Sequence, residues 1–186
     1  MKIAVYPGSF NPLHKGHEAV IGHLAAMPEF GAVYLVVSPK NPLKTEISAE
    51  SAQERFEAAK RAVQRCGFSS NVRADDIELH LPAPQYTIRT LDKLKEREPD
   101  NDFTLVTGAD QLADIRRWKD YGRILSEYGI VVFPRNGIDT AALRESLLEE
   151  NPDFKITLAD MPEVDISSTE IRAGIASGKD MSEFLM

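Results

Sequence analysis

The most informative segment of the chain is residues 5–17, which have the sequence VYPGSFNPLHKGH. A short apolar strand is expected over Ile3 to Tyr6, followed by a turn rich in Gly, Ser, Asn and Pro. His14 and His17 come next, and a spacing of three residues places both imidazoles on one face of the first turn of a helix. Backbone N–H groups at a helix start lack partners within the helix and favour an anion. The two side chains are therefore poised to meet phosphate oxygens.

The same segment has a less specific explanation, because strand, turn and helix start is a common arrangement and two histidines can simply be solvated. The histidine pair alone does not separate the two explanations. The surrounding residues favour the phosphate site, since Gly8, Asn11 and Pro12 occupy the turn directly after the strand. Gly16 fits as well, because a side chain there is expected to block the close approach of a nucleotide.

The bulk properties are those of one ordinary α/β domain of 186 residues, with 42% hydrophobic and 27% charged residues. No apolar run approaches the roughly 20 residues of a membrane span, and Met1-Lys2 leads into the first strand without a signal-peptide pattern. The single Cys66 excludes an internal disulfide. We therefore expect a cytoplasmic protein. The sequence does not distinguish a monomer from a homo-oligomer.

The net charge of −7 and the absence of a basic stripe argue against binding of duplex nucleic acid, which rests on many phosphate contacts. If the substrate is phosphorylated, it must be held by a few individual Lys and Arg side chains rather than by a broad basic surface. The candidates are Lys15, Lys40, Lys44, Arg135 and Arg172.

Apolar, β-branched segments alternate with helical ones along the whole chain. Strands are expected at Ile3–Tyr6, Val33–Val37, Phe103–Thr107, Ile130–Phe133 and, more weakly, Lys155–Leu158. Helices are expected at Glu18–Met27, Ala49–Arg65, Thr87–Glu96 and Asp139–Glu149. This alternation predicts an α/β fold with a mainly parallel sheet and helices on both faces. Ligands of such sheets bind beyond the carboxyl ends of the strands, so we expect the catalytic and binding residues in the loops that follow the strands. Those loops are Pro7–Leu13, Ser38–Ser48 (a candidate lid), Gly108–Asp110 and Pro134–Gly137.

A second phosphate signal lies at residues 165–172, with the sequence DISSTEIR. Ser167 and Glu170 have the spacing of a capping box, and capping alone would explain those two residues. It does not explain three consecutive hydroxyls followed by Arg172 one turn later. Hydroxyls, free N–H groups and a guanidinium at a helix start form a compact polyphosphate site.

Both segments resemble signatures of the nucleotidyltransferase superfamily: residues 14–17 its HxGH motif, and residues 166–172 its ISSTxIR motif for the triphosphate. Further segments occur in the order expected for bacterial nicotinate-nucleotide adenylyltransferases, and the resemblance covers Ile3 to about Gly178. These segments are PLK at 42–44, QYTIRTL at 85–91, GAD at 108–110, WK at 118–119 and PR at 134–135. The resemblance implies a Rossmann-like nucleotidyltransferase fold with a single domain, 1–186, in which residues from about 166 to 186 complete the ATP site.

The resemblance also implies an activity, which is adenylyl transfer from ATP to nicotinate mononucleotide by direct in-line displacement, giving deamido-NAD and pyrophosphate. Mg²⁺ would be carried by ATP, with no metal held by the protein. The implied catalytic residues are His14, His17, Lys44 and Arg172. ATP would be bound by Gly8, Ser9, Phe10, Gly16, His17, Gly108, Asp110, Ile166, Ser167, Ser168 and Arg172, and the acceptor by Asn11, Lys44, Tyr86, Thr87, Trp118 and Arg135.

Physical roles can be proposed for several of these residues, and some of them have a purely structural explanation as well. Thr87 opens a helix, so it can receive the pyridine carboxylate. Trp118 can either stack on a pyridine ring or serve as a core anchor. Asp110 can bind ribose, help to position Mg²⁺, or cap a helix. The chain departs from the family pattern at three positions, with Leu43 in place of a His, Gln85 in place of a Ser and Asn136 in place of a Pro.

Three alternatives remain at this stage. One is the same chemistry with another acceptor, such as nicotinamide mononucleotide or phosphopantetheine, or a cytidylyltransferase. A second is a class I aminoacyl-tRNA synthetase fragment, whose HIGH motif residues 14–17 resemble, although the chain is short and acidic. A third is a non-catalytic nucleotide-binding protein. The two intact phosphate segments argue against the last, because binding alone would not require two imidazoles at the α-phosphate.

Overall fold

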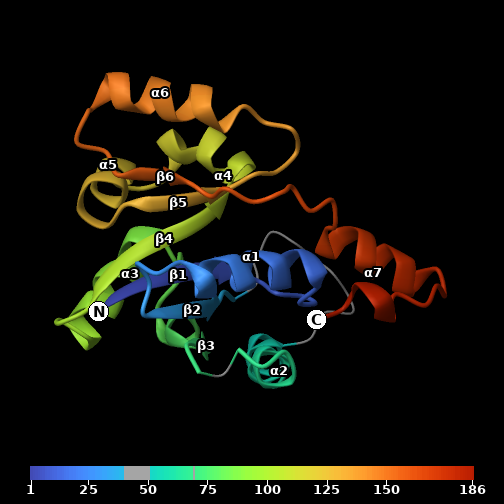
Figure 1. Ribbon diagram of the computed structural model, residues 1–186. Coiled ribbons are helices and arrows are strands. Elements are labelled where there is room, and N and C mark those ends of the chain that lie inside the picture. Colours follow the sequence, from blue (N-terminus) through green and yellow to red (C-terminus); the bar gives the residue numbers. More distant parts are fainter. Residues whose placement is uncertain (40–50, 69) are drawn as a thin grey trace.

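The computed structural model describes residues 1–39, 51–68 and 70–186. Within them the chain forms a six-stranded parallel sheet in the order β3-β2-β1-β4-β5-β6 (Figure 1). The strands are β1 (Lys2–Gly8), β2 (Ala32–Val37), β3 (Val72–Asp75), β4 (Asp102–Gly108), β5 (Ile130–Phe133) and β6 (Ile156–Leu158). The order reverses between the neighbours β1 and β4, which makes their carboxyl ends the switch point where α/β sheets bind ligands.

The helices of the described residues cover both faces of the sheet (Figure 1). They are α1 (Lys15–Ala26), α2 (Ala52–Arg65), α3 (Thr87–Arg97), α4 (Ala109–Ala113), α5 (Tyr121–Arg123), α6 (Thr140–Glu150) and α7 (Ser168–Ala176), with short helical turns η1 (Ile77–His80), η2 (Ile115–Arg117), η3 (Ile124–Tyr128) and η4 (Ser182–Phe184). The predicted fold class is thus confirmed, with the five predicted strands and four predicted helices each found within a few residues of the expected bounds.

The alternation of side chains along each strand divides the core into two layers. Ile3 and Val5 of β1 lie in a cluster with Leu91 of α3 and Leu112 of α4. Ala4 and Tyr6, one residue out of phase, lie in the opposite cluster; its helix residues include Val20, Ile21 and Leu24 of α1 and Ala59, Ala62 and Val63 of α2. The sheet is therefore buried on both faces, which is typical of parallel sheets.

The structure differs from the expected local structure in two places. The strand β3 has no counterpart among the predicted strands, because VRAD has only two apolar residues and its backbone pairs with β2 through tertiary contact. The first helix begins at Lys15 rather than Glu18, because His14 caps it. Leu43, Lys40, Lys44 and most of the predicted lid at Ser38–Ser48 lie outside the described residues.

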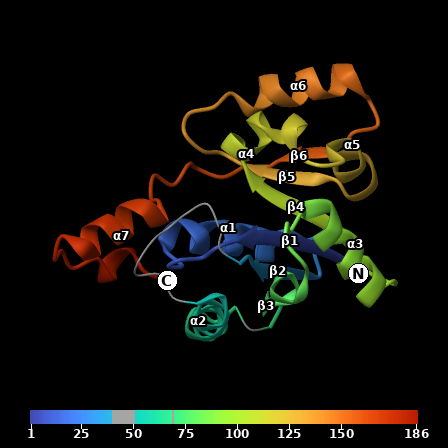
Figure 2. The ribbon, with the colours of Figure 1, turned by 180° about the vertical axis from the view of Figure 1, so that it is seen from behind.

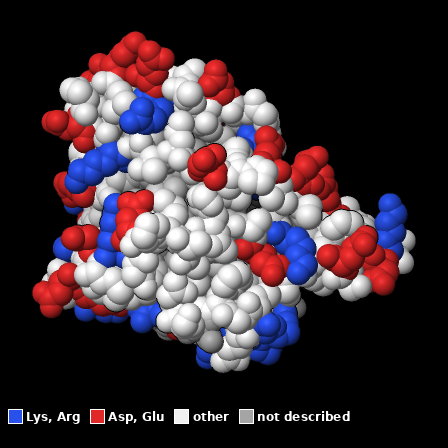
Figure 3. All heavy atoms as spheres, viewed as in Figure 1, with Lys and Arg blue, Asp and Glu red and all other residues white. Residues whose placement is uncertain are grey.

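The C-terminal helix α7 lies beyond the sheet, beside the start of α1 and close to residue 186 (Figures 1 and 2). On the face shown in Figure 3, acidic and basic side chains are interspersed around a largely uncharged centre. That face of the described residues has no continuous basic area, in agreement with the sequence. Among the described helices, none is both long and apolar enough to cross a membrane.

Candidate functional site

The first turn of α1 is built from two histidines that cap each other. His14 is the N-cap, and its Nδ1 accepts from the backbone N–H groups of Gly16 (3.0 Å) and His17 (3.4 Å). The Nδ1 of His17 accepts in turn from the N–H of His14 at 3.2 Å. The two rings stack with their centroids 3.7 Å apart. Because both Nδ1 atoms accept, each neutral ring carries its proton on Nε2 and presents an N–H donor there.

The surroundings keep both rings neutral. Burial lowers the pKa of His14 to about 4, and the positive charge of Arg135 acts in the same direction. Burial also lowers the pKa of His17 well below its ordinary value, with His14 and Arg135 adding to the effect. At neutral pH the pair therefore offers two neutral donors rather than two cations.

This arrangement predicts that stability falls on mild acidification. The unfolded chain takes up a proton on His14 near pH 6.5, whereas the folded chain resists it until about pH 4, so the free energy of unfolding declines as the pH falls between those values. Urea unfolding at pH 7.5, 6.0 and 5.0 measures the decline. His14→Asn keeps a capping side chain that does not titrate, so its decline should be shallower than that of wild type. Equal declines would contradict the assignment.

Gly16 has a structural role besides the expected one. A Cβ at this position would lie 2.8 Å from Cε1 and 2.9 Å from Nδ1 of His14. Contacts under 3.0 Å force the neighbour to move, and this neighbour is the buried ring that caps the helix. The absent side chain therefore makes room for the imidazole of His14 in addition to any space that it leaves for a nucleotide.

We accordingly expect Gly16→Ala to displace His14 and to lose the cap. The loss of an N-cap costs about 1 kcal/mol, and the shifted ring should lower turnover further. Urea unfolding and steady-state turnover check the two effects. Gly22→Ala is the control on the same helix, since a Cβ there meets only the Phe68 ring at 3.7 Å. Wild-type turnover in Gly16→Ala would show that the ring position does not matter.

The pair opens onto a pocket at the switch point. Besides both histidines and Gly16, the pocket is lined by Tyr6, Val20, Phe133, Pro134, Arg135, Met161, Val164 and Ile166. Arg135, expected at the acceptor, thus lies beside the histidines, with its Nε 3.9 Å from Oδ2 of Asp110. Burial raises the pKa of Tyr6 at the floor of this pocket, so its hydroxyl stays protonated.

Asp110 lies at the end of β4, in the first turn of α4. It does not cap that helix: Gly108 is the N-cap residue, and its N–H donates to Oε1 of Gln111 at 3.3 Å. A Cβ on Gly108 would lie 2.7 Å from Oδ1 of Asp110. Gly108 therefore leaves space for the Asp110 carboxylate near Arg135.

The second phosphate signal lies directly against the first. Ser167 caps α7 and forms the expected capping box with Glu170. Ser168 Oγ donates to the carbonyl of Pro12 at 3.1 Å, and Arg172 Nη1 donates to the carbonyl of Asn11 at 2.7 Å.

The C-terminal residues reach the same turn from another side. Leu185 forms an antiparallel bridge with His14, and the N–H of Met186 donates to the carbonyl of Leu13 at 3.4 Å. The carbonyl of Met186 accepts from Arg65 of α2 at 2.7 Å. The turn before α1 is therefore enclosed by α7 and by residues 185–186.

Two of the six expected acceptor residues, Tyr86 and Thr87, lie at the start of α3. Tyr86 is the N-cap residue, is 37% exposed, and has Arg89 and Lys119 over its ring at 5.1 and 4.9 Å from the centroid. Thr87 is the first helical residue, and Trp118 is half-buried and packs against the core, as the structural explanation expected.

The structure bears on two of the three departures from the family pattern. Asn136 has φ +55°, a conformation that Pro cannot adopt, so the backbone after Arg135 differs from one with Pro there. Gln85 Nε2 donates to the carbonyl of Leu81 at 3.1 Å, which braces the loop before α3.

Sequence reasoning missed two buried charged residues near the site. Glu78 of η1 accepts from Thr90 Oγ1 at 2.9 Å, and burial raises its pKa. Arg55 of α2 is fully buried. A signal existed for Arg55, because it shares the helical spacing of the buried Ala59 and Ala62 and so lies on the inward face of α2.

Comparison with known proteins places this chain in a family. The cytidylyltransferase-like family matches residues 5–174. Two curated proteins carry the name "Probable nicotinate-nucleotide adenylyltransferase". The one from Flavobacterium johnsoniae is 36% identical over 185 residues, covering 100% of this chain and 92% of its own. The one from Bacteroides fragilis is 37% identical over 184 residues, covering 99% and 87%.

Solved structures support the fold. The Plasmodium falciparum nicotinic acid mononucleotide adenylyltransferase complexed with NaAD superposes with a TM-score of 0.80 at 24% identity, over 98% of this chain and 87% of that one. The same protein complexed with APC gives a TM-score of 0.76 over the same shares. With full-length relatives above 35% identity and the family match over residues 5–174, the chain belongs to the nicotinate-nucleotide adenylyltransferase family of cytidylyltransferase-like proteins.

Proposed function

We propose that the protein transfers the adenylyl group of ATP to nicotinate mononucleotide, giving deamido-NAD and pyrophosphate. The observation that carries the proposal is the pair of neutral imidazoles, stacked at 3.7 Å, which line a pocket at the switch point of the sheet. Full-length relatives with this activity in their names support the choice of reaction.

The reaction needs positioning more than acid–base chemistry. A phosphate oxygen of the acceptor would attack the α-phosphorus of ATP in line, forming one P–O bond while the bond to the β-phosphate oxygen breaks and pyrophosphate leaves. The attacking phosphate is already ionised at neutral pH, so no general base is required. The protein would hold the reactants in line and stabilise the charge on the transferring group.

The residues have distinct parts in that task. His14 and His17 would donate from Nε2 to oxygens of the α- and β-phosphates, where charge builds up in the transition state. Ser167, Ser168 and Arg172 would line the β- and γ-phosphates at the start of α7, where unpaired N–H groups favour an anion. Lys44 is proposed for the same phosphates from the sequence alone.

The end of β1 with the turn and helix start that follow it, the end of β4, and the residue before the cap of α7 would hold the rest of ATP. We assign Gly8, Ser9, Phe10, Gly16, Gly108, Asp110 and Ile166 to ATP. Mg²⁺ would arrive with ATP.

The acceptor would bind at the start of α3. Thr87 and the N–H groups of the first turn can receive the pyridine carboxylate. Arg89 and Lys119, which lie over the exposed ring of Tyr86, add positive charge nearby. Trp118, Asn11, Arg135 and, from the sequence alone, Lys44 complete the proposed acceptor set. A carboxylate gains more from this field than the amide of nicotinamide mononucleotide does, which favours the acid as substrate.

We further propose that the chain is a single domain, 1–186, in which residues from about 166 to 186 complete the ATP site. The contacts of Ser168, Arg172 and Leu185 with the turn before α1 support this. A cytoplasmic location stays a prediction from the sequence.

Pyrophosphate release with ATP and Mg²⁺ tests the function. Nicotinate mononucleotide, nicotinamide mononucleotide and phosphopantetheine are compared as acceptors at equal concentration. We expect strong release only with the nicotinate form. Equal pyrophosphate release with another acceptor would mean that the proposed acceptor residues do not select nicotinate mononucleotide. No release with any of them, together with ATP binding by calorimetry, would overturn the catalytic proposal and leave a nucleotide-binding protein.

A further inference from the structure

Arg55 is the largest polar side chain among the fully buried ones of the described residues. It lies in the first turns of α2 and is 1% exposed. Burial of a guanidinium costs several kcal/mol unless its N–H groups are hydrogen-bonded. An apolar residue would pack against the sheet without that cost, so packing alone does not explain an arginine here.

The guanidinium joins two loops at the carboxyl edge of the sheet. Its Nη1 donates to the carbonyl of Ser9, at 2.5 Å, and to the carbonyl of Ser38, at 2.8 Å. The N–H of Ser38 also donates to the carbonyl of Gly8 at 2.9 Å. Arg55 thus continues the connection between β1 and β2 past the end of their backbone pairing.

The Ser9 carbonyl precedes a residue in a restrained conformation. Phe10 has φ +48°, in the left-handed region that disfavours side chains by about 1–2 kcal/mol. Such a conformation persists only when the surroundings fix it. The buried Phe10 ring lies edge-on to Tyr6, with centroids 5.5 Å apart, and edge-on to His17 at 5.2 Å.

These contacts form one path from Arg55 to the catalytic pair. We propose that Arg55 is a positioning residue, whose guanidinium fixes the Ser9–Phe10 turn so that the Phe10 ring holds His17 at the angle needed to meet the nucleotide. The catalytic consequence rests on the proposed function, whereas the orientation of His17 does not. Lysine is a poor substitute, because a single ammonium on a flexible stem lacks the planar fork of arginine.

The test compares Arg55→Lys with Arg61→Lys, a control on the exposed side of the same helix. We expect kcat/KM of Arg55→Lys to fall about 10- to 100-fold, the effect of a misplacement near 1 Å. Arg61→Lys should stay within about twofold of wild type. A histidine side-chain 15N–1H spectrum at pH 7.5 reports the position of His17 independently of turnover, and its His17 Nε2–H signal should move only in Arg55→Lys.

Phe10→Leu is the second variant, because it removes the ring contact with His17 and leaves both Arg55 hydrogen bonds in place. It should move the same His17 signal and lower kcat/KM, and it keeps the proposal testable if Arg55→Lys does not fold. An unmoved His17 signal in either folded variant would overturn the proposal, whatever happens to turnover. If the wild-type protein shows no turnover, only the proposed function is refuted. The spectra would still test whether Arg55 and Phe10 position His17.

Discussion

Replacement of His17 by alanine is expected to lower turnover by roughly 10²–10³, or about 2.7–4 kcal/mol of transition-state stabilisation. The reason is geometric. His17 Nδ1 is occupied by the backbone N–H of His14, so the ring has one donor left, at Nε2, and the ring is kept neutral by burial. A preorganised neutral donor adds stabilisation where charge develops and needs no reorganisation during the reaction. Pyrophosphate release at saturating ATP and nicotinate mononucleotide measures the effect.

Two companion variants make the result specific. His23→Ala changes a histidine near the end of the same helix and should leave turnover within about twofold of wild type. His17→Gln keeps a donor near the position of Nε2 and should retain more activity than His17→Ala. The loss of the reciprocal cap is expected to cost His17→Ala about 1 kcal/mol of stability, whereas the amide oxygen of Gln in His17→Gln can still accept from the N–H of His14. A folded His17→Ala protein with turnover close to wild type would remove His17 from the mechanism.

The parts of the site that could be predicted from the sequence depend on neighbours along the chain. The spacing of His14 and His17, the turn that precedes them, and the capping box of Ser167 and Glu170 are local patterns, and the described structure has each of them. The alternation of strands and helices likewise predicts the parallel sheet. Together these patterns are enough to place the histidines at the carboxyl end of β1.

The remaining features depend on partners that are distant in sequence. Nothing near Ser168 or Arg172 indicates that they donate to carbonyls of Pro12 and Asn11, which lie 156 and 161 residues away. The role of Arg55 depends on Ser9 and Ser38 in the same way. Such contacts follow from how the layers pack, which a single sequence does not reveal.

His14 is an instructive intermediate case. Its place in the motif predicts a donor to phosphate, but whether it lies inside the helix or caps it depends on one dihedral angle. The structure has it in extended conformation, φ −141°, with its ring folded back onto the helix start. That conformation explains Gly16, because the ring occupies the space that a side chain would need.

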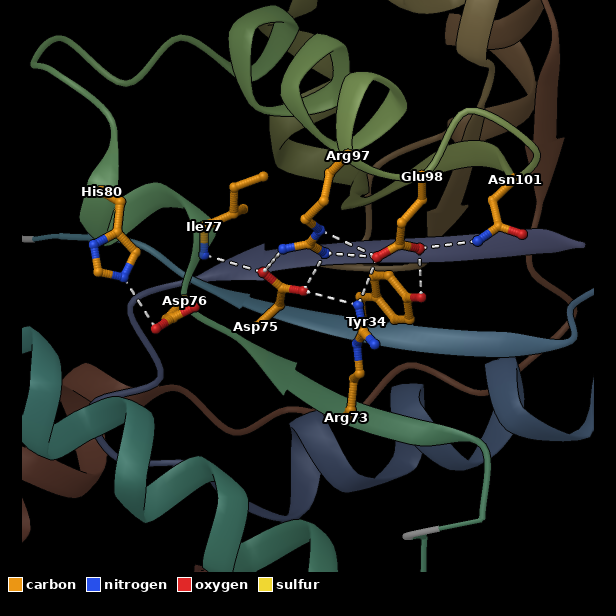
Figure 4. A network of polar contacts seen from close by, with 9 residues as sticks. All are labelled: Tyr34, Arg73, Asp75, Asp76, Ile77, His80, Arg97, Glu98 and Asn101. Carbon is orange, nitrogen blue, oxygen red and sulfur yellow. Dashed lines mark hydrogen bonds and ion pairs between the residues drawn. The ribbon is translucent and has the colours of Figure 1, made fainter.

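The largest expected effect on stability comes from a polar network on the far side of the sheet from α1 and α2 (Figure 4). Asp75 ends β3, and its side chain is only 4% exposed. Its carboxylate accepts from Arg97 of α3 at 3.1 and 2.6 Å, from the backbone N–H of Ile77 at 3.0 Å and from Arg73 at 3.3 Å. The buried charge is thus satisfied mainly by the two-pronged contact with Arg97, which ties the edge strand β3 to α3.

Arg97→Ala is expected to lower the free energy of unfolding by about 3 kcal/mol. Breaking a buried pair by removing one partner costs about 3–5 kcal/mol, because the remaining charge is left uncompensated. The low end applies here, since Arg97 is partly exposed and Arg73 still reaches Asp75. For a domain of this size about 3 kcal/mol corresponds to a fall in Tm of roughly 6–12 °C. Urea unfolding and thermal melting measure the change.

Lys93→Ala is the matched control, because it removes a cation from an exposed ion pair with Glu96 on the same helix. Exposed pairs contribute about 0–1 kcal/mol, so this variant should melt close to wild type. The double variant Asp75→Asn/Arg97→Ala separates charge from packing, since a neutral amide needs no cation. If uncompensated charge is the cause, the double variant should be less destabilised than the sum of its single changes. Simple additivity would mean that β3 is stabilised by the aliphatic stem of Arg97 rather than by its guanidinium.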